Sequence, residues 1–564
     1  MRRLVLLIIV CITTSVFSVG QTFTTLVNFD GFNGSGPAGP LVQASDGNFY
    51  GVTTYGGGSR NAGVAFKVTP EGVLTILHIF CVQNSCPDGL FPKGALLEAN
   101  GGDLYGTTFG TGGIGLYGTV YRMTREGVLT TVHTFNGLDG TSPAAGLMQA
   151  KDETFYGTTI GGGPSGYGTV FRMTSEGVLN TLYGFGYLEG NEPYAGLVQA
   201  DDGDFYGTTS TGGPVVGTVF KITPGGMLTT LHSFWVNDGS QSYAGLVQGK
   251  DGNLYGTTYS GGTYNSGTIF KITPEGALTT LYNFCSQLNA CPEGEGPADS
   301  LIQATDGNFY GTTSQGGQNG WGTVFQMTPD GTLTTLHDFN RDDGGAPSAG
   351  LVQATDGSFY GTTSEGGSSD QGTVFRQIVY PALTVEKSGM GRVSSVDGHI
   401  DCGGACSWWY YDGEQITLSA VPAPGYTFSG WSSCDNINGS YCSVTMAGAR
   451  NITASFTSVS DITLTSLTFK PSYVRGGQLS AGTLTLSGPA PAGGLSVALS
   501  SDHPGVAHPP SFVLVPGGRS SVQFAVQTLP VKSNTAVSIT ATSGSSQVSG
   551  TLMVGTTSLP PSLK

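Results

Sequence analysis

Charged side chains are scarce in this chain, since Asp, Glu, Lys and Arg make up only 11% of its 564 residues. Cationic residues are the scarcer group, with 22 Lys and Arg against 38 Asp and Glu and a formal net charge of -16. Nucleic acids and anionic lipids both require clustered Lys and Arg for binding. We therefore expect no nucleic-acid partner, and we interpret the acidity as a source of solubility outside the cell.

The motifs that mark common catalytic sites are also absent. The sequence contains no HExxH, no GxSxG and no phosphate-binding glycine loop. No two histidines stand at the spacing of metal ligands. We therefore predict no catalytic residue, no metal and no cofactor, although the paired carboxylates of a glycosidase would leave no local pattern to find.

Long apolar runs are missing except at the start of the chain. Arg2 and Arg3 precede an apolar stretch that ends near Phe17, and small residues follow it up to Gly20. This arrangement predicts a secretory signal over residues 1–20, because the run is too short and too early to be assigned as a spanning helix. We expect no transmembrane segment after signal removal and a secreted or surface-associated location.

Cysteine is infrequent, with nine residues, of which Cys11 lies in the predicted signal. The other eight form four close pairs: Cys81 with Cys86, Cys285 with Cys291, Cys402 with Cys406, and Cys434 with Cys442. Local disulfides in an oxidising compartment account for this spacing most simply. Each would constrain the unfolded chain by roughly 2 kcal/mol.

What the chain does contain is a repeat. The stretch Phe-Tyr-Gly-Thr-Thr at residues 205–209 recurs at intervals of about 50 residues. Its tyrosines are Tyr50, Tyr105, Tyr156, Tyr206, Tyr255, Tyr310 and Tyr360. A fixed period of this length indicates a repeat architecture.

Each repeat holds four segments of β character. In the fourth copy they are residues 195–200, 205–209, 217–223 and 228–234, and they are rich in aromatic and β-branched residues. The turns between the first and second and between the third and fourth contain Gly beside Asp or Pro, as hairpins require. Four short strands in about fifty residues are typical of a propeller blade.

The two ends of the array differ by one strand. The seventh copy has only three segments, ending near Arg376, whereas residues 22–29 form an unpaired fourth segment before the first copy. An open solenoid would instead need polar capping repeats. We therefore predict an all-β fold in which residues 21–380 form a seven-bladed β-propeller, closed by the N-terminal strand so that no edge stays exposed.

Two smaller β modules and a tail follow the array. Residues 382–457 carry two of the cysteine pairs and Trp431, which we expect to be the core ring of a small module stapled by disulfides. Residues 460–556 hold seven short alternating segments and no cysteine, which favours an immunoglobulin-like β-sandwich. Residues 557–564 form a Pro- and Ser-containing tail that we expect to be disordered.

The connections within the array fall into two classes. The first-to-second and third-to-fourth turns are short and uniform, whereas the second-to-third and blade-to-blade connections vary, and we expect each class on its own face of the ring. Binding residues usually sit on variable loops of a rigid scaffold. Aromatic residues of the variable connections are the candidate ligand-binding residues: Tyr117, Tyr167, Tyr194, Trp235, Tyr243, Tyr264 and Trp321. Packing of these rings between blades is the alternative.

Histidines, cations and acidic turns also recur at fixed positions of the repeats. His78, His133, His232 and His337 stand where two other copies hold Tyr183 and Tyr282, so we interpret them as space-filling, hydrogen-bonding residues. The third segment repeats a cation, for which we favour pairing with the acidic turns over an anion-binding ring. Acidic turns such as Asp238-Gly239 offer too few oxygens for calcium, and we favour turn chemistry.

The repeats resemble the GloVer tandem repeat of exported bacterial proteins, through Gly-Leu-Val-Gln-Ala, Asp-Gly-Asn-Phe-Tyr-Gly-Thr-Thr, Gly-Thr-Val-Phe-Lys-Ile-Thr-Pro and Leu-Thr-Thr-Leu. The resemblance implies an extracellular or surface protein and brings no settled activity. Through Asp401-Cys402-Gly403 and Phe428-Ser429-Gly430-Trp431, residues 382–457 are similar to a divergent internalin-type bacterial repeat. Residues 460–556 resemble bacterial immunoglobulin-like domains through the stretch at residues 486–494.

We expect a non-catalytic protein that binds a glycan or an extracellular protein through the variable face. The first alternative is a polysaccharide hydrolase or lyase, which several carboxylates in the central funnel would favour and a lining of Gly, Thr and Val would oppose. The second alternative is a structural spacer at the cell surface, which complete burial of the candidate aromatic rings would favour.

Overall fold

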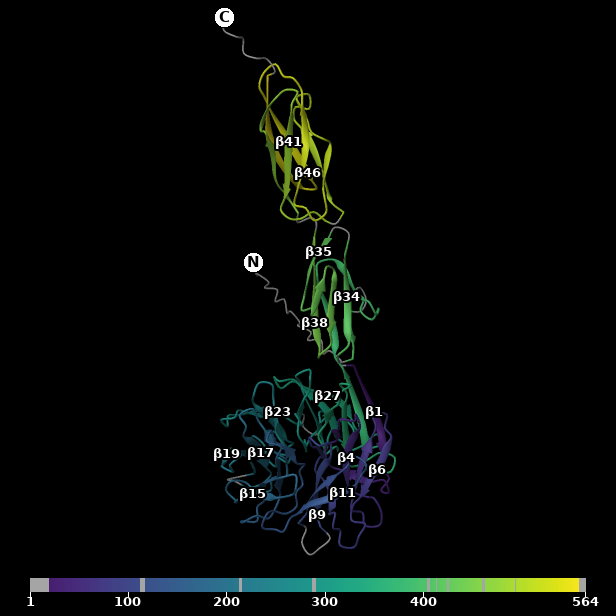
Figure 1. The fold of residues 1–564 in the computed structure, drawn as a ribbon. Coiled ribbons are helices and arrows are strands. Elements are labelled where there is room, and N and C mark those ends of the chain that lie inside the picture. Colours follow the sequence, from purple (N-terminus) through teal and green to yellow (C-terminus); the bar gives the residue numbers. More distant parts are fainter. Residues whose placement is uncertain are drawn as a thin grey trace, which may run out of the picture. The chain divides into compact units, whose positions relative to one another are not determined.

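The computed structural model describes residues 20–111, 117–212, 216–286, 291–402, 406–411, 413–423, 426–458, 462–491 and 493–556. The predicted tail lies outside these residues, and so does the predicted signal except for Gly20. The chain divides into two compact units, Met1–Tyr380 and Pro381–Lys564. All named secondary structure is β-strand, which confirms the all-β prediction (Figure 1). Nowhere in the described ranges is there a helix of the length and apolarity needed to cross a bilayer.

In unit 1 the described strands form seven antiparallel sheets, one for each repeat, and we call each sheet a blade. The first strands of the blades are β3 Val42–Gln43, β8 Leu97–Glu98, β12 Met148–Gln149, β16 Val198–Gln199, β20 Val247–Gln248, β24 Ile302–Gln303 and β28 Val352–Gln353. The second strands are β4 Phe49–Tyr55, β9 Leu104–Gly110, β13 Phe155–Thr159, β17 Phe205–Thr209, β21 Leu254–Thr258, β25 Phe309–Thr313 and β29 Phe359–Thr363.

The remaining strands complete the blades. The third strands are β5 Val64–Val68, β10 Thr119–Met123, β14 Thr169–Met173, β18 Thr218–Ile222, β22 Thr268–Ile272, β26 Thr323–Met327 and β30 Thr373–Tyr380. The fourth strands are β6 Leu74–Ile79, β11 Leu129–Thr134, β15 Leu179–Gly184, β19 Leu228–Ser233, β23 Leu278–Asn283, β27 Leu333–Asp338 and β1 Gly20–Asn28. Blades one and two have an extra short strand, β2 Ser35–Pro37 and β7 Leu90–Pro92. In the fourth copy the first strand is shorter than the predicted segment 195–200, because only Val198 and Gln199 pair with the second strand.

The Phe-Tyr-Gly-Thr-Thr strand is buried along its whole length in five of the blades, and its glycine explains why. A Cβ atom on Gly207 would lie 2.6 Å from Cζ of Phe220 and 2.9 Å from Cδ2 of Leu197. The aromatic ring of the third strand therefore lies directly on the second strand. The other copies show the same close approach, with Tyr121 in place of phenylalanine in blade two.

The tyrosine of this strand joins each blade to the next. Tyr156 stacks on Phe205 of the following blade with ring centroids 4.2 Å apart, and its hydroxyl donates to Asp152 at 3.4 Å in its own hairpin turn. Equivalent ring contacts join Tyr105 to Phe155, Tyr255 to Phe309, Tyr310 to Phe359 and Tyr360 to Phe49. The last contact links the seventh blade to the first, so the array closes on itself.

A cycle of hydrogen bonds follows the same path around the ring. In each blade the backbone N–H after the first strand donates to a side chain on the first strand of the next blade. The acceptors are Glu98, Gln149, Gln199, Gln248, Gln303, Gln353 and, closing the cycle from Thr355, Gln43 at 2.9 Å. The strand β1, purple in Figure 1, pairs with β30 from Gly20↔Tyr380 to Asn28↔Thr373. The N-terminal strand thus completes the seventh blade.

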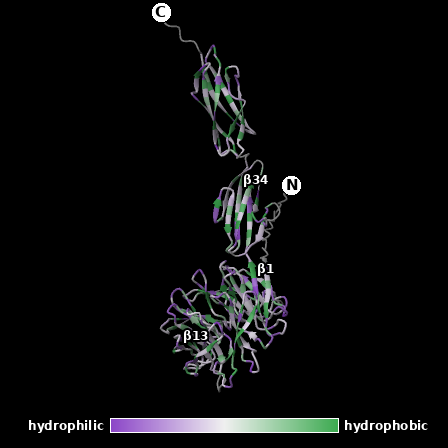
Figure 2. Cartoon of the chain, turned by 45° about the vertical axis from the view of Figure 1, so that its right-hand side comes forward, coloured by the Kyte–Doolittle hydropathy of each residue, from purple (hydrophilic) through white to green (hydrophobic). Residues whose placement is uncertain are grey.

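Unit 2 begins with a module of two sheets around one core. One sheet has the order β33 Ser407–Trp409, β31 Ala382–Ser388, β38 Arg450–Ser458 and β35 Tyr426–Ser432. The other has the order β32 Gly391–Ser395, β34 Gln415–Pro422, β37 Tyr441–Thr445 and β36 Asn436–Asn438. Burial alternates along β34, as a sheet with one face on a core requires, and Figure 2 shows the banded hydropathy of this strand. Trp431 packs against the core but is only partly buried.

The second module of unit 2 is also a sandwich. Its first sheet has the order β39 Leu464–Lys470, β41 Leu479–Leu486, β45 Ser521–Thr528 and β43 Ala507–His508. Its second sheet has the order β40 Tyr473–Arg475, β47 Ser546–Gly555, β46 Thr535–Ser543, β42 Leu495–Ser501 and β44 Phe512–Val515. Aliphatic residues of both sheets form one core, among them Leu484, Val497 and Ile539. This arrangement agrees with the predicted immunoglobulin-like type.

We expect the substitution Gly207→Ala to lower the free energy of unfolding by about 1–3 kcal/mol, because the new methyl group overpacks the contact with Phe220. Gly225→Ala is the matched control, since its added Cβ would meet nothing closer than Thr223 Oγ1 at 3.7 Å. Urea titrations of both variants measure the difference. Equal stability of the two variants would contradict the packing argument.

Candidate functional site

A cavity of about 570 Å³ lies where all seven repeats meet. Each repeat contributes residues that immediately precede its first strand, such as Ala38, Ala144 and Ser348. Most of these residues are Gly, Ala or Ser, so backbone atoms form much of the wall. The blade-to-blade connections therefore supply the centre of the ring.

The rim of this cavity is held by a repeated backbone kink. Glu192 has a φ of 56°, a left-handed conformation that is unfavourable for any residue except glycine, and Pro193 follows it. Its N–H donates to the Tyr167 carbonyl at 3.2 Å and its carbonyl accepts from the Ser210 N–H at 3.2 Å. The equivalent residues with positive φ are Gly36, Phe91, Ser142, Gln241, Gly296 and Ala346. These bonds tie the two variable connections of neighbouring blades together, which makes the rim a rigid support.

Three tyrosines form a continuous row on one side of the cavity. Tyr194 and Tyr243 meet edge to face at 5.1 Å, and Tyr243 meets Tyr259 at 5.7 Å. All three line the cavity and are half-buried, so each keeps part of its ring exposed. Burial raises the pKa of Tyr194 and of Tyr243, with Glu192 adding to both shifts, so both hydroxyls stay protonated at neutral pH. We call Tyr194, Tyr243 and Tyr259 the tyrosine row.

Two charged side chains stand in the cavity wall, on different blades. Asp299 belongs to blade six, and its carboxylate accepts N–H bonds from Ser300 at 2.6 Å and from Gly350 at 2.7 Å. Lys93 belongs to blade two, and its Nζ lies 4.5 Å from the centroid of Phe109. Burial raises the pKa of the Asp299 carboxyl and lowers the pKa of Lys93. No other Asp, Glu, Lys or Arg is among the described residues that line this cavity.

A second hollow of about 360 Å³ continues from the first, and both share Tyr259, Ala298 and Ser348 in their walls. Trp321 lines the second hollow together with Gln315 and Glu365. The guanidinium carbon of Arg341 lies 5.2 Å from the Trp321 ring centroid. The amide of Gln315 donates to the Tyr259 hydroxyl at 3.0 Å, which connects the two hollows through a polar contact.

The structure thus separates the seven candidate aromatic residues. Tyr194 and Tyr243 line the central cavity and Trp321 lines the second hollow. The other four candidates line neither hollow and are exposed: Tyr117, Tyr167, Trp235 and Tyr264. Tyr259, Lys93 and Asp299 line the central cavity but were not predicted. Tyr259 directly follows the Gly-Thr-Thr run of its repeat, where other copies hold residues such as Ile160 or Ser210. The only sequence signal for Tyr259 was therefore that this repeat differs from the others at that position.

The histidines and the acidic turns prove to be partners. Nε2 of His232 lies 3.0 Å from Oδ2 of Asp238, and the other carboxylate oxygen accepts the Trp235 N–H at 2.8 Å. The pairs His78–Asp88, His133–Asp139 and His337–Asp343 repeat this contact. In the tyrosine copies the partner is a glutamate, and burial with the nearby Glu293 raises the pKa of Tyr282 to about 12. These contacts support a structural role for both groups and explain the acidic turns without calcium.

The repeated cations of the third strand pair with the first hairpin turn. Lys221 lies 2.9 Å from Asp202 and 2.8 Å from Asp204, and Lys271 lies 2.7 Å from Asp251. The tyrosine hydroxyl shares this carboxylate, since Tyr206 donates to Asp202 at 2.7 Å. Burial and the bond to Asp202 raise the pKa of Tyr206 to about 12. These ion pairs favour the pairing interpretation over an anion-binding ring.

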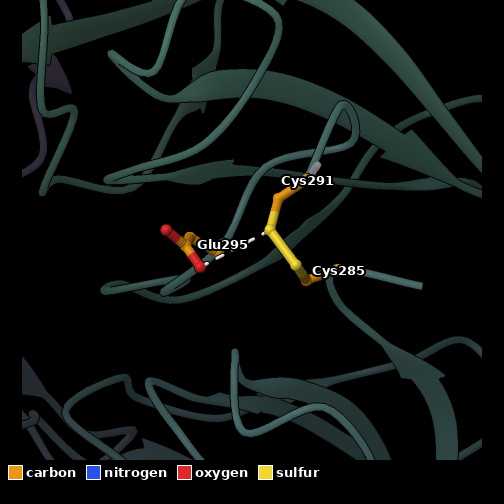
Figure 3. A group of neighbouring side chains, drawn as sticks. All are labelled: Cys285, Cys291 and Glu295. Carbon is orange, nitrogen blue, oxygen red and sulfur yellow. Dashed lines mark hydrogen bonds between the residues drawn. A yellow bond between two sulfur atoms is a disulfide. The ribbon is translucent and has the colours of Figure 1, made fainter. Parts of the chain in front are cut away.

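All four predicted disulfides are present: Cys81–Cys86, Cys285–Cys291, Cys402–Cys406 and Cys434–Cys442. Glu295 lies beside the second of them, with its carboxylate 3.6 Å from Sγ of Cys291 (Figure 3). These three side chains could surround a metal ion by distance alone. In the disulfide, however, the sulfur atoms are not thiolates, and the thiolate is the form that binds a metal. The group is therefore better described as a stapled loop.

The model of the Gloeobacter/Verrucomicrobia repeat matches residues 58–216, 91–296 and 215–388, which together exceed half of the chain. The model of the divergent InlB B-repeat domain matches residues 382–460. No curated protein matches the chain.

Several solved structures are distantly similar. A candidate 6-phosphogluconolactonase from Bacteroides uniformis is 18% identical with a TM-score of 0.38, over 53% of this chain and 83% of its own. A quinonprotein alcohol dehydrogenase-like protein from Bacteroides thetaiotaomicron is 14% identical with a TM-score of 0.35, over 53% of this chain and 65% of its own. An alpha-L-arabinofuranosidase from Clostridium thermocellum is 16% identical with a TM-score of 0.27, over 45% and 96%. Likeness at this level assigns no activity to this chain.

We expect Asp238→Ala to lower the free energy of unfolding by about 1–2 kcal/mol, because His232 and the Trp235 N–H both lose their acceptor. Asp201→Ala is the control, since Asp201 is exposed and its carboxylate makes no described hydrogen bond or ion pair. Urea titration compares the two. A loss of similar size in both variants would refute the role assigned to the His–Asp pair.

Proposed function

The chain belongs to the Gloeobacter/Verrucomicrobia repeat family, and we propose that its ring of repeats is a non-catalytic saccharide-binding unit whose site is the central cavity. The observation that carries this proposal is the tyrosine row in a cavity whose wall is otherwise formed largely by Gly, Ala and Ser. The second hollow with Trp321 extends the same surface. The cavity is also within the usual size of small-molecule sites, roughly 300–1,000 Å³.

The wall of the cavity suits a sugar in both its apolar and its polar parts. Half-buried tyrosine rings offer a flat apolar surface and a hydroxyl at the same place, which matches the apolar faces and the hydroxyl groups of a saccharide. Ser300, Ser348 and the exposed backbone of Gly and Ala add hydrogen-bonding groups close to the rings. Because the rim is tied by backbone bonds between variable connections, the site needs little reorganisation on binding.

The wall gives little support to glycosidic cleavage. Most glycosidases use two carboxyl groups, roughly 5–10 Å apart, on either side of the bond that breaks. Asp299 is the single carboxylate among the described residues of the cavity wall, and Gly, Ala and Ser make up most of the lining. Binding therefore accounts for the described residues better than hydrolysis or lysis does. Since the tyrosine row is only half-buried, a purely structural spacer is also the weaker account.

An extracellular location agrees with this function. The four local disulfides are the kind that persists in oxidising compartments. We therefore place the binding unit outside the cell, with an extracellular protein as the alternative ligand.

We expect Tyr243→Ala to weaken saccharide binding by at least tenfold, because Tyr243 contacts both other members of the tyrosine row. Tyr264→Ala is the matched control: this tyrosine is 46% exposed and lines neither hollow. A glycan array with the full chain identifies bound sugars, and calorimetry then compares the variants. Equal affinity of both variants would move the site away from the cavity. A chain that binds no glycan on the array would contradict saccharide binding and leave a protein ligand.

A further inference from the structure

The cavity wall departs from its repeat pattern at Asp299. Residues at the equivalent position of the other six repeats are Gly39, Gly94, Ala145, Ala195, Ala244 and Ala349. The other six blades therefore form their first strands with glycine or alanine at this position. The carboxylate of Asp299 is therefore not needed to build a blade.

We propose that the saccharide bound in the central cavity carries a free amino group, and that the Asp299 carboxylate binds this group as an ammonium ion. This inference rests on the proposed function and adds the chemical class of the ligand. The partner is thus an amino sugar with an unacylated amine.

The hydrogen bonds of Asp299 leave it able to accept more. Each carboxylate oxygen accepts one backbone N–H, from Ser300 at 2.6 Å and from Gly350 at 2.7 Å. The Ser300 side chain is a further hydrogen-bond partner of this carboxylate. Because an ionised carboxylate can accept about four bonds, at least one position remains for a ligand. In the described part of the chain, Asp299 forms no ion pair with Lys, Arg or His.

An ammonium group of the ligand would supply the positive partner that the Asp299 carboxylate does not have among the described residues. Burial raises the pKa of Asp299, which means that its charged form is incompletely stabilised by the protein alone. Hydrogen bonds between two ionised groups are roughly twice as strong as those between neutral groups. A sugar hydroxyl would also bind here, but it would not neutralise the charge.

Two further features favour a cationic ligand. Tyr194, Tyr243 and Tyr259 line the same cavity, and aromatic rings attract cations through their negative π-faces. The formal net charge of the chain is -16, and an acidic protein raises the local concentration of cationic ligands.

The position of Lys93 favours one orientation of the ligand in the cavity. It stands in blade two, away from Asp299 in blade six, and repels a cation from its part of the wall. Since Lys93 forms no ion pair among the described residues, its ammonium group suits hydroxyl or acidic groups of the same ligand. The amino group is therefore directed to Asp299.

Two probes test the inference on the full chain: the tetrasaccharide of glucosamine and that of N-acetylglucosamine, which differ in the charge of the amine. By calorimetry near neutral pH, we expect the glucosamine probe to bind about tenfold tighter. Asp299→Ala should remove this preference and leave the acetylated probe bound as before. Six repeats carry Gly or Ala at this position, so the variant is expected to fold, which a thermal unfolding curve checks.

A control and three outcomes decide the result. Asp330→Asn removes one negative charge from an exposed hairpin turn and should keep the preference, which separates a local contact from the overall charge. Equal affinity for both probes in the unmodified chain would overturn the inference and leave saccharide binding standing. An unchanged preference in Asp299→Ala would overturn the role of Asp299. Failure of both probes to bind would overturn the inference, and the glycan array would then decide the proposed function.

Discussion

The stacking of one tyrosine per repeat on the following repeat is the contact on which the ring depends. Tyr156 is held from two directions, because its hydroxyl donates to Asp152 of its own hairpin and its ring stacks on Phe205 of the next blade. Tyr50 and Tyr206 instead pack in one cluster with a leucine of the next blade, Leu104 and Leu254. The contact between Tyr360 and Phe49 is the same contact made across the two ends of the array. A single repeat could not bury this tyrosine, so the blades are stable only as a closed set.

The close approach of strands within a blade follows from the residue next to that tyrosine. Glycine at this place lets the third-strand ring lie on the second strand, and any side chain would push the sheet apart. The frame that results is nearly the same in all seven repeats. Specific recognition can then arise only where equivalent positions carry different side chains, and the central cavity is such a place, since Tyr194, Tyr243, Asp299 and Lys93 stand among Gly and Ala.

The outer parts of the variable connections have another task. The carboxylates of the acidic turns hold the fourth strand through a histidine and cap the start of the loop through a backbone N–H. Where the array has longer connections, the disulfides Cys81–Cys86 and Cys285–Cys291 shorten the free chain. The acidic turns and the disulfides therefore hold the variable connections in place. The side chains that line the central cavity are not needed for this task and can differ between repeats. This division explains why Trp235, although an exposed aromatic residue, lies outside the candidate site.

The sequence by itself determined the all-β class, the repeat unit with its hairpin turns, and the cysteine pairs, because each depends on residues close together in the chain. Turn glycines, strand composition and a 50-residue period are local signals. The tertiary structure alone decided which side chains share the cavity. Tyr194, Tyr259 and Asp299 come from three consecutive blades and line one cavity only once these blades pack side by side, so no spacing along the chain indicates them. Their neighbours Tyr167 and Tyr264 satisfied the same criterion of composition and lie elsewhere, because the direction of a side chain on a loop depends on the backbone bonds that hold that loop.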